Sequence, residues 1–303
     1  MDITKNFKIP RGLKYLLISI PFVVLTFMFA YVPLFGWILS LTDFKPGMTL
    51  THLHFVGFIN FVKLYNQRND IVRVLRNTLA MSGLGLLTSP LPIVFAILLN
   101  ELQFIKLKKF IQTITTLPNF ISWIVIFGFA FSLFSNNGLI NSVLNGLGLY
   151  RSPTGIIGDV NHVWMFQLCL QLWKTLGWSS IIYLAAITGI ETELYEAARV
   201  DGANKFRCIW HITLPGIIPT FFVLFILGIS NILNNGFDQY FIFYNPLVAN
   251  KIEVLDYYVY KVGLLIGDYP FSIAIGITKS LISIALLFAA NFVSKKVRGQ
   301  SIF

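Results

Sequence analysis

The sequence contains few charged residues and almost no cysteine. Asp, Glu, Lys and Arg make up 12% of its 303 residues, and Cys169 and Cys208 are its two cysteines. A soluble globular domain carries roughly 25% charged residues, and a small disulfide scaffold needs far more cysteine, so both classes are excluded. Hydrophobic residues instead make up 56% of the chain, and the mean hydropathy is +0.73. This composition also excludes a disordered chain and predicts an integral membrane protein.

The sequence also lacks the common motifs of catalysis and metal binding. It has no G-x-x-x-x-G-K-[ST] sequence, and the nearest match, Gly276-Ile-Thr-Lys279-Ser280, lacks the glycine before the lysine. It has no His-Glu-x-x-His, and the pair His52-x-His54 has no cysteine or third histidine nearby. We therefore expect no catalytic residue, no metal site and no cofactor bound by this chain.

Six stretches are apolar over the length of about 20 residues that a helix needs to cross a bilayer. They lie near residues 15–40, 77–99, 110–134, 163–189, 216–242 and 270–294. The first is broken by Pro21 and Pro33 and has no small-residue cleavage site, which argues against a signal peptide. The expected fold is an all-α membrane protein with six transmembrane helices.

The basic residues predict that both termini are cytoplasmic. Thirteen of the 23 Lys and Arg residues fall on the side of the two termini, whereas eight are spread over the longer connections of the other side. The positive-inside rule places the richer side in the cytoplasm. The net charge of +10 then reflects a membrane face, so we expect contact with membrane lipid and no nucleic-acid partner.

These spans divide the chain into segments. We expect a cytoplasmic N-terminus, the first transmembrane helix, an external loop, a core domain with five helices, and a cytoplasmic tail, at residues 1–14, 15–40, 41–72, 73–294 and 295–303. Five of the eight outer charges lie within 41–76, so an amphipathic or re-entrant piece on the membrane surface remains the alternative to an external loop there.

The most charged stretch, 191–215, lies between the fourth and fifth spans, on the predicted cytoplasmic side. Two apolar stripes at helical spacing flank Gly202, a natural helix stop, and Leu214-Pro215 ends the second stripe. The stripes predict two short amphipathic helices with a glycine corner. Such helices can simply lie flat on the membrane interface. The apolar residues are Leu194, Ala197 and Ala198 in the first stripe, and Phe206, Ile209 and Trp210 in the second.

The spacing within this stretch resembles the EAA loop of the permease subunits of ABC importers. Glu196-Ala197-Ala198 is followed after three residues by Gly202, and after nine more by Ile212-x-Leu214-Pro215. Further motifs look like the carbohydrate-uptake branch of that family. These motifs are Arg76-Asn77-Thr78, Leu117-Pro118, Trp173-Lys174-x-x-Gly177-Trp178, Tyr183-Leu-Ala-Ala, Phe237-Asp238-Gln239 and Tyr244-Asn245-Pro246. The whole resemblance covers roughly 73–294.

This resemblance implies a fold, a function and a set of partners. The fold would be that of a type I, MetI-like importer permease, which is not an enzyme and sits as a multi-pass protein in the bacterial cytoplasmic membrane. The chain would form half of the pathway for an oligosaccharide, with a second homologous permease subunit as its heterodimer partner. Two ATP-binding subunits, which hold ATP and Mg²⁺, would dock on the EAA loops, and an extracellular sugar-binding protein would deliver the cargo.

The loop residues would transmit the motion of the ATPase to the membrane helices. Small residues allow close approach, the glycine makes a corner, the apolar face fits a groove, and the glutamate sets the register. The ATPase-coupling residues implied are Glu196, Ala197, Ala198, Asp201, Gly202, Ala203, Phe206, Ile212, Leu214 and Pro215.

Polar residues inside the spans are the candidates for a substrate path. A charge within the bilayer costs at least about 2.5–3.5 kcal/mol on insertion scales, and such residues usually face a cavity. Sugars are bound by hydrogen-bonding side chains and by aromatic faces, and two lysines would favour anionic glycans. A buried ion pair, a lysine bonded to carbonyls or hydrogen bonds between helices remain the alternatives. The candidates are Lys174, Trp178, Asn231, Asn234, Asn235, Asp238, Gln239 and Lys279.

Other functions remain open at this point. The chain could serve an ABC importer for another solute, such as glycerol phosphate or an amino acid. It could also be a channel or a non-transport membrane scaffold whose loop binds a regulatory partner.

Overall fold

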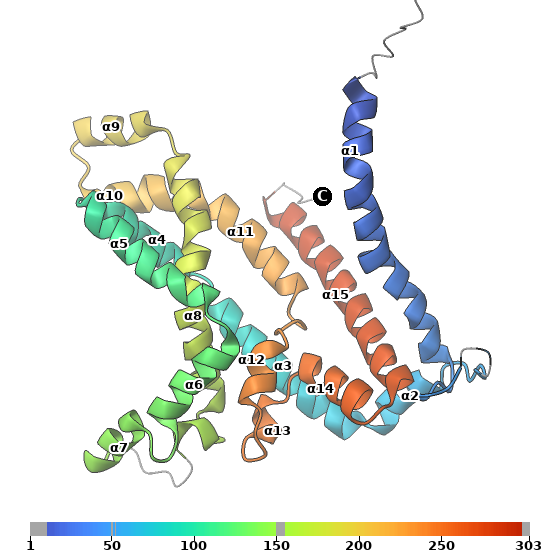
Figure 1. Cartoon of the computed structure of the whole chain (residues 1–303). Coiled ribbons are helices and arrows are strands. Elements are labelled where there is room, and N and C mark those ends of the chain that lie inside the picture. The colour runs from blue at the N-terminus through green and yellow to red at the C-terminus, as the bar shows by residue number, and fades with distance from the viewer. Residues whose placement is uncertain (1–10, 50, 52, 150–154, 299–303) are drawn as a thin grey trace, which may run out of the picture. The chain divides into compact units, whose positions relative to one another are not determined.

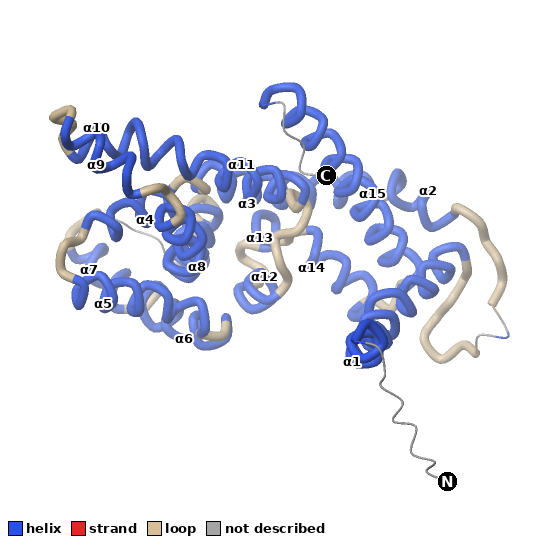
Figure 2. Tube along the Cα trace, turned by 90° about the horizontal axis from the view of Figure 1, so that it is seen from above, coloured by secondary structure: helices blue, strands red, loops and turns tan. Residues whose placement is uncertain are grey.

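The computed structural model describes residues 11–49, 51, 53–149 and 155–298. These residues form helices joined by loops (Figure 2), with no β-strand among them and one isolated antiparallel bridge from Thr42 to Phe55. The predicted all-α class is therefore confirmed. The chain forms two compact units, Met1–Asn66 with Val259–Thr278, and Gln67–Tyr258 with Lys279–Phe303.

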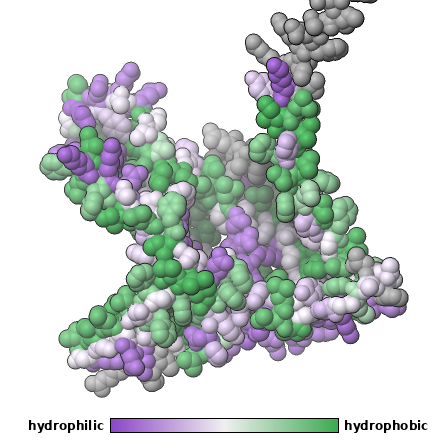
Figure 3. All heavy atoms as spheres, in the orientation of Figure 1, coloured by the Kyte–Doolittle hydropathy of each residue, from purple (hydrophilic) through white to green (hydrophobic). Residues whose placement is uncertain are grey.

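The first unit is built around one long apolar helix. Its elements are α1 (Arg11–Thr26), the π-helical η1 (Phe27–Tyr31), the 3₁₀-helical η2 (Val32–Leu41), α2 (Ile59–Asn66), the π-helical η7 (Lys261–Leu265) and the first part of α15 (Tyr269–Arg298). Apolar side chains cover the surface of α1 (Figure 3) and are exposed from Tyr15 onward. A helix that exposes apolar residues all round is suited to lipid.

The second unit contains the remaining elements. They are α3 (Arg68–Thr88), α4 (Leu91–Glu101), α5 (Ile105–Thr116), η4 (Leu117–Phe120), α6 (Trp123–Phe134), α7 (Leu139–Gly146), η5 (Ile156–Gly158), α8 (Val163–Thr188), α9 (Thr192–Val200), α10 (Lys205–Cys208), η6 (Ile209–Thr213), α11 (Leu214–Ser230), α12 (Asp238–Phe243), α13 (Ala249–Ile252), α14 (Leu255–Tyr260, which runs across the division between the units) and the rest of α15. Figure 1 shows their course.

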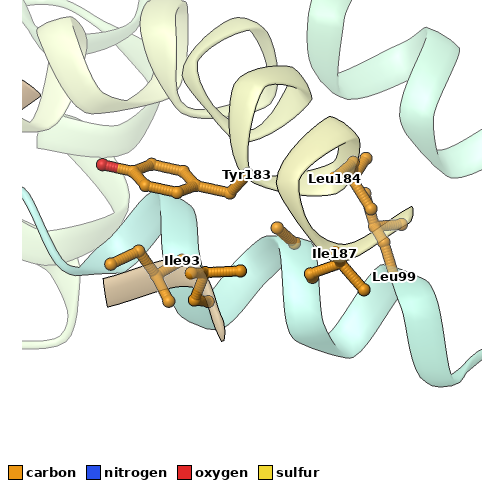
Figure 4. Packing of buried hydrophobic residues seen from close by; sticks show 7 residues of the cluster. Ile93, Leu99, Tyr183, Leu184 and Ile187 are labelled. Atoms are coloured by element: carbon orange, nitrogen blue, oxygen red, sulfur yellow. The ribbon is translucent and has the colours of Figure 1, made fainter. Parts of the chain in front are cut away.

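A cluster of buried apolar side chains joins α4, α8 and α11. Figure 4 shows Ile93 and Leu99 of α4 facing Tyr183, Leu184 and Ile187 of α8. Close packing of this kind stabilises helices in lipid through van der Waals contact, because lipid tails already solvate apolar groups. The cluster fixes the two helices between which the 191–215 segment emerges.

Five helical stretches of the described chain are long and apolar enough to cross a membrane. They are Lys14–Leu41, Arg68–Glu101, Trp123–Gly146, Lys205–Ser230 and Tyr269–Lys296. The predicted stretch 163–189 forms α8, a 26-residue helix that is long enough to span but carries Gln167, Gln171 and Lys174. That α8 spans the membrane therefore stays a prediction. The cytoplasmic position of the two termini also stays a prediction, and residues 1–10 and 299–303 lie outside the described residues.

Two predicted spans have different bounds in the structure. The stretch 110–134 is not one helix, because η4 follows α5 and the chain is extended at Ile121 and Ser122 before α6 begins. Pro118 lies in the first turn of η4, where its missing N–H removes one hydrogen bond of a continuous α-helix. The stretch 216–242 begins earlier, at Lys205, and its helix ends at Ser230.

The 191–215 segment also departs from its prediction at one end. Leu214-Pro215 does not end the second short helix, because η6 and α11 continue it into the membrane span. A π-helical turn shifts the hydrogen bonds to i→i+5 just before Pro215, and Pro is tolerated in the first turn of a helix. The segment 41–72 contains α2 and the first turn of α3. Its side of the membrane stays a prediction.

Candidate functional site

The helix–glycine–helix arrangement predicted for 191–215 is present. Gly202 has φ +77° and follows Asp201, the C-cap residue of α9. The Gly202 N–H donates to Arg199 O at 3.0 Å, and the Ala203 N–H donates to Ala198 O at 2.8 Å. These two bonds form a Schellman motif, in which a left-handed glycine satisfies the last carbonyls of a helix. The spacing of Ala198, Gly202 and Ala203 is therefore explained by the backbone of this corner.

The tip of this segment is exposed. Glu196, Ala197 and Asp201 lie on the surface, and the rings of Phe206 and Trp210 stack at 6.4 Å while 70% and 58% exposed. Figure 3 shows hydrophilic side chains gathered over α9. An apolar patch rimmed by charges is typical of a protein-docking surface.

The base of the segment is fixed to the membrane helices. The Tyr195 and Thr213 hydroxyls lie 2.9 Å apart, which joins α9 to η6, and Thr213 is buried. A Cβ on Gly216 would lie 2.6 Å from Ile190 Cδ1, so α11 packs directly against the end of α8. Ile212 and Leu214 are half-buried here. A displacement of the tip would thus be passed to α8 and α11.

Lys174 closes the break between α5 and α6. Its Nζ donates to the carbonyls of Pro118 at 3.2 Å, of Asn119 at 3.1 Å, and of Ile121, and it lies 5.4 Å from the Trp123 ring centroid. Backbone carbonyls freed within a membrane need such donors. The structure therefore matches the alternative in which this lysine bonds to carbonyls.

Two of the motifs noted in the sequence meet at this break. A Cβ on Gly177 would lie 2.2 Å from Thr115 O, so only glycine allows α8 to approach α5 this closely. The Trp178 ring packs edge-on against Phe120, with centroids 5.6 Å apart. Lys174, Gly177 and Trp178 thus hold the segment that contains Leu117-Pro118.

Lys279 is paired with Asp256, which the sequence prediction missed. Lys279 Nζ donates to Asp256 Oδ1 and, at 2.5 Å, to Asn234 Oδ1. Asp238, a predicted residue of the substrate path, is exposed at the start of α12. The sequence does not identify Asp256 as the partner of Lys279, because the two residues lie 23 positions apart, in different helices, and no helical spacing links them.

The amides after α11 have different surroundings. Asn231 and Asn234 are exposed, and Asn231 Nδ2 donates to Leu227 O at 3.0 Å. Asn235 Nδ2 instead donates to Ser82 Oγ at 2.8 Å on α3. Gln239 is buried, and its Nε2 donates to the backbone and side-chain oxygens of Gln167 at 3.0 and 2.8 Å. Gln239 therefore joins α12 to α8, as in the alternative of hydrogen bonds between helices.

A cavity of about 310 Å³, lined by both polar and apolar side chains, lies between α8 and the junction of α3 with α4. Gln171, Thr175 and Ser179 line it from successive turns of α8, opposite Thr88 and Ser89. These three residues were not among the candidates predicted from the sequence, although their i, i+4, i+8 spacing places them on one helix face. The cavity is within the size range of small-molecule sites.

The Arg76-Asn77-Thr78 motif fastens the chain before α14 to α3. Asn77, fully buried, donates from Nδ2 to Asn250 O and Glu253 O, both at 3.0 Å. Thr78 Oγ1 accepts from the Leu255 N–H at 2.8 Å. This use of the motif is structural.

A charged cluster lies beside this anchor. Arg73 Nη2 pairs with the buried Glu253 at 2.8 Å and with Asp70 at 2.9 Å. Burial first, and then the carboxylates of Asp70 and Glu253, raise the pKa of Tyr258 to about 12, with Arg73 opposing them. The Tyr258 hydroxyl therefore stays protonated at neutral pH and donates to Gln67 Oε1 at 3.2 Å.

No group of three His, Cys, Asp or Glu side chains that could hold a metal ion occurs within the described ranges. His54 contacts Asp43 at 3.2 Å, and His52 lies outside those ranges.

A family model described as "Binding-protein-dependent transport system inner membrane component" matches residues 89–299. Two proteins of Bacillus subtilis (strain 168) align with nearly the whole chain. Protein LplB is 36% identical over 289 residues, which is 95% of this chain and 90% of the relative. The polygalacturonan/rhamnogalacturonan transport system permease protein YteP is 36% identical over 295 residues, or 96% and 90%.

Solved structures of a bacterial alginate ABC transporter share the fold. One, in complex with alginate pentasaccharide-bound periplasmic protein, has a TM-score of 0.85 and 32% identity, and covers 96% of this chain and 97% of that chain. Another, of a transporter involved in the import of the acidic polysaccharide alginate, has a TM-score of 0.83 and 32% identity, with 95% and 97% covered.

Proposed function

Because the chain belongs to the family of binding-protein-dependent transport system inner membrane components and is a multi-pass permease of a sugar ABC importer, we propose that it carries an acidic oligosaccharide inward, driven by a separate ATPase that docks on 191–215. The acidic cargo is supported by the names of two relatives, which concern polygalacturonan and alginate.

The observation that carries the coupling role is the geometry of the 191–215 segment. Its tip is exposed and rigid, because the Schellman corner at Gly202 and the Tyr195–Thr213 contact hold α9 in place. A docked rigid element can make different contacts in two states of a partner, as coupling requires. Glu196 would face a basic groove, and ATP and Mg²⁺ would be held by the two partner ATPase subunits. None would be held by this chain.

We assign the substrate path to the cavity beside α8 and to the exposed residues after α11. Gln171, Thr175 and Ser179 supply hydrogen-bonding groups suited to sugar hydroxyls. Asn231 and Asn234, which are exposed after α11, add amides, and Asn234 Oδ1 also accepts from Lys279 at 2.5 Å. Lys174, which donates to three carbonyls, and the buried Gln239 would shape this path without binding cargo.

The proposed assembly contains a second, homologous permease subunit, two ATPase subunits and an extracellular sugar-binding protein. In this assembly α8 would span the membrane in addition to the five stretches named above. Both termini would lie in the cytoplasm, on the same side as the 191–215 segment. A binding-protein complex of this kind exists for the alginate transporter.

The test compares Gly202→Asp with Gly148→Asp in the co-purified assembly. Both glycines have positive φ, at +77° and +72°, and a Cβ on either would meet nothing within 4 Å, so the backbone strain is matched. We expect Gly202→Asp to abolish ATP hydrolysis stimulated by the binding protein with cargo, and Gly148→Asp to leave it intact. Equal stimulation in both variants would refute the docking role. Assays with uronate-bearing and neutral oligosaccharides test the cargo class, which fails if only neutral glycans stimulate.

A further inference from the structure

The membrane-span stretch Lys205–Ser230 is followed by an irregular segment that lies beside α15, another helix long enough to span the membrane. Residues 231–237 are non-helical, between α11 and α12, and Gly236 has φ +82°. They contact Lys279, which is ten residues, or about 15 Å, from the start of α15. Irregular backbone at this depth is tolerated only where protein groups or a water-filled cavity satisfy its N–H and C=O groups.

Asp256 supplies the hydrogen-bond acceptor for two of these backbone N–H groups. Its Oδ2 accepts from two successive backbone N–H groups, those of Asn235 at 3.0 Å and Gly236 at 3.1 Å. Two successive N–H groups beside a left-handed glycine form a concavity that binds an anion. A second tie reaches the same segment from α3, since Ser82 Oγ donates to Ile232 O at 2.5 Å.

Lys279 neutralises this carboxylate from the opposite side. It donates to Asp256 Oδ1 and to Asn234 Oδ1, and the side chains of Lys279 and Asp256 are only 15% and 17% exposed. If Lys279 left to bind the carboxylate of an acidic sugar, Asp256 would remain with an unpaired negative charge beside that sugar. The arrangement therefore disfavours Lys279 as a cargo-binding cation.

We propose that Asp256 and Lys279 are positioning residues for transport: as an ion pair they hold 231–237 in place, so that Asn231 and Asn234 face the path, and Lys279 does not select the charge of the cargo. This inference rests on the proposed function. It assigns Lys279 to the buried ion pair that the sequence left open as an alternative to a substrate-binding role.

The first experiment measures uptake and stimulated ATP hydrolysis by the complete importer in liposomes. The variants are Asp256→Asn, Lys279→Gln, the double variant and Lys279→Arg, with Gly276→Ala as a control one turn away on α15, where a Cβ meets nothing within 4 Å. We expect each neutralising single variant to lower kcat about tenfold or more for neutral and uronate-bearing oligosaccharides alike. The double variant and Lys279→Arg should return to within about threefold of wild type.

Two results would overturn the proposal. One is a rise in KM for uronate-bearing cargo alone in Lys279→Gln, whichever residue stands at position 256, because this would show Lys279 reading the cargo. The other is a double variant no more active than the worse single variant, because two residues that act as a pair must rescue one another.

A second experiment is independent of transport, so it separates this proposal from the proposed function. Leu233 is 4% exposed within the 231–237 segment. In a chain with Cys169 and Cys208 replaced by serine, Leu233→Cys should react slowly with a water-soluble maleimide. Adding Asp256→Asn or Lys279→Gln should raise the rate about tenfold, and adding both should lower it again. Equal rates in all four backgrounds would refute the positioning role even if no oligosaccharide stimulates the importer.

Discussion

Gly177→Ala tests the close approach of α8 to α5. An added Cβ would lie 2.2 Å from Thr115 O and 2.4 Å from Thr115 C, whereas Cβ contacts under 3.0 Å essentially never occur. The obstructing atoms are backbone, so the helices must separate by roughly 0.8 Å, the difference between 2.2 and 3.0 Å. The separation would also stretch the bonds from Lys174, one turn away, to the Pro118 and Asn119 carbonyls.

Overpacking of this kind costs about 1–3 kcal/mol. In a protein of this size each kcal/mol lowers Tm by roughly 2–4 °C, so we expect a fall between about 2 and 12 °C for the purified chain in detergent. Gly128→Ala is the matched control, because Gly128 also lies in a helix, α6, and a Cβ there would meet nothing within 4 Å. An equal Tm for the Gly177→Ala and Gly128→Ala variants, together with normal transport by Gly177→Ala, would refute the reasoning.

Two further substitutions test the other internal anchors. Lys174→Met leaves three carbonyls at the α5–α6 break without their donor. Each group left unsatisfied costs about 1–3 kcal/mol, so this variant should have a lower Tm than Lys174→Arg, which keeps N–H donors at this position. A Lys174→Met chain as stable as the Arg variant would contradict this role. Asn77→Ala removes both bonds to the chain before α14, so limited proteolysis should begin near Asn250 at lower protease concentration than in wild type. An unchanged cleavage pattern would count against the anchor.

The 191–215 segment was the part most open to prediction from sequence. Its helices follow from local apolar periodicity, and its corner follows from the unique access of glycine to positive φ. Both are properties of a few consecutive residues. The continuation through Pro215 was missed, because a π-helical turn that accommodates a proline has no clear sequence signal.

The polar residues inside the membrane spans were found by the sequence, which left a substrate-binding role and a structural role open for each and could not name the structural partners. Lys174, Gln239 and Lys279 stood out because polar groups in apolar stretches are costly. Each one has a protein partner that belongs to another element. The residues of α8 that line the cavity were missed for the same reason, since Gln171 lies in a cavity only because Ser89, from another helix junction, lines its opposite side.

The sequence by itself determined the membrane class, the approximate position of most apolar spans and the helix–glycine–helix form of 191–215, since these depend on composition and short-range periodicity. Only the tertiary structure decided that Lys279 pairs with Asp256 instead of Asp238, and that Lys174 reaches carbonyls 53 to 56 residues away. It also decided that Gly177 lies against the α5 backbone. Such contacts depend on how helices pack after they form, and packing brings together residues whose separation along the chain has no fixed period.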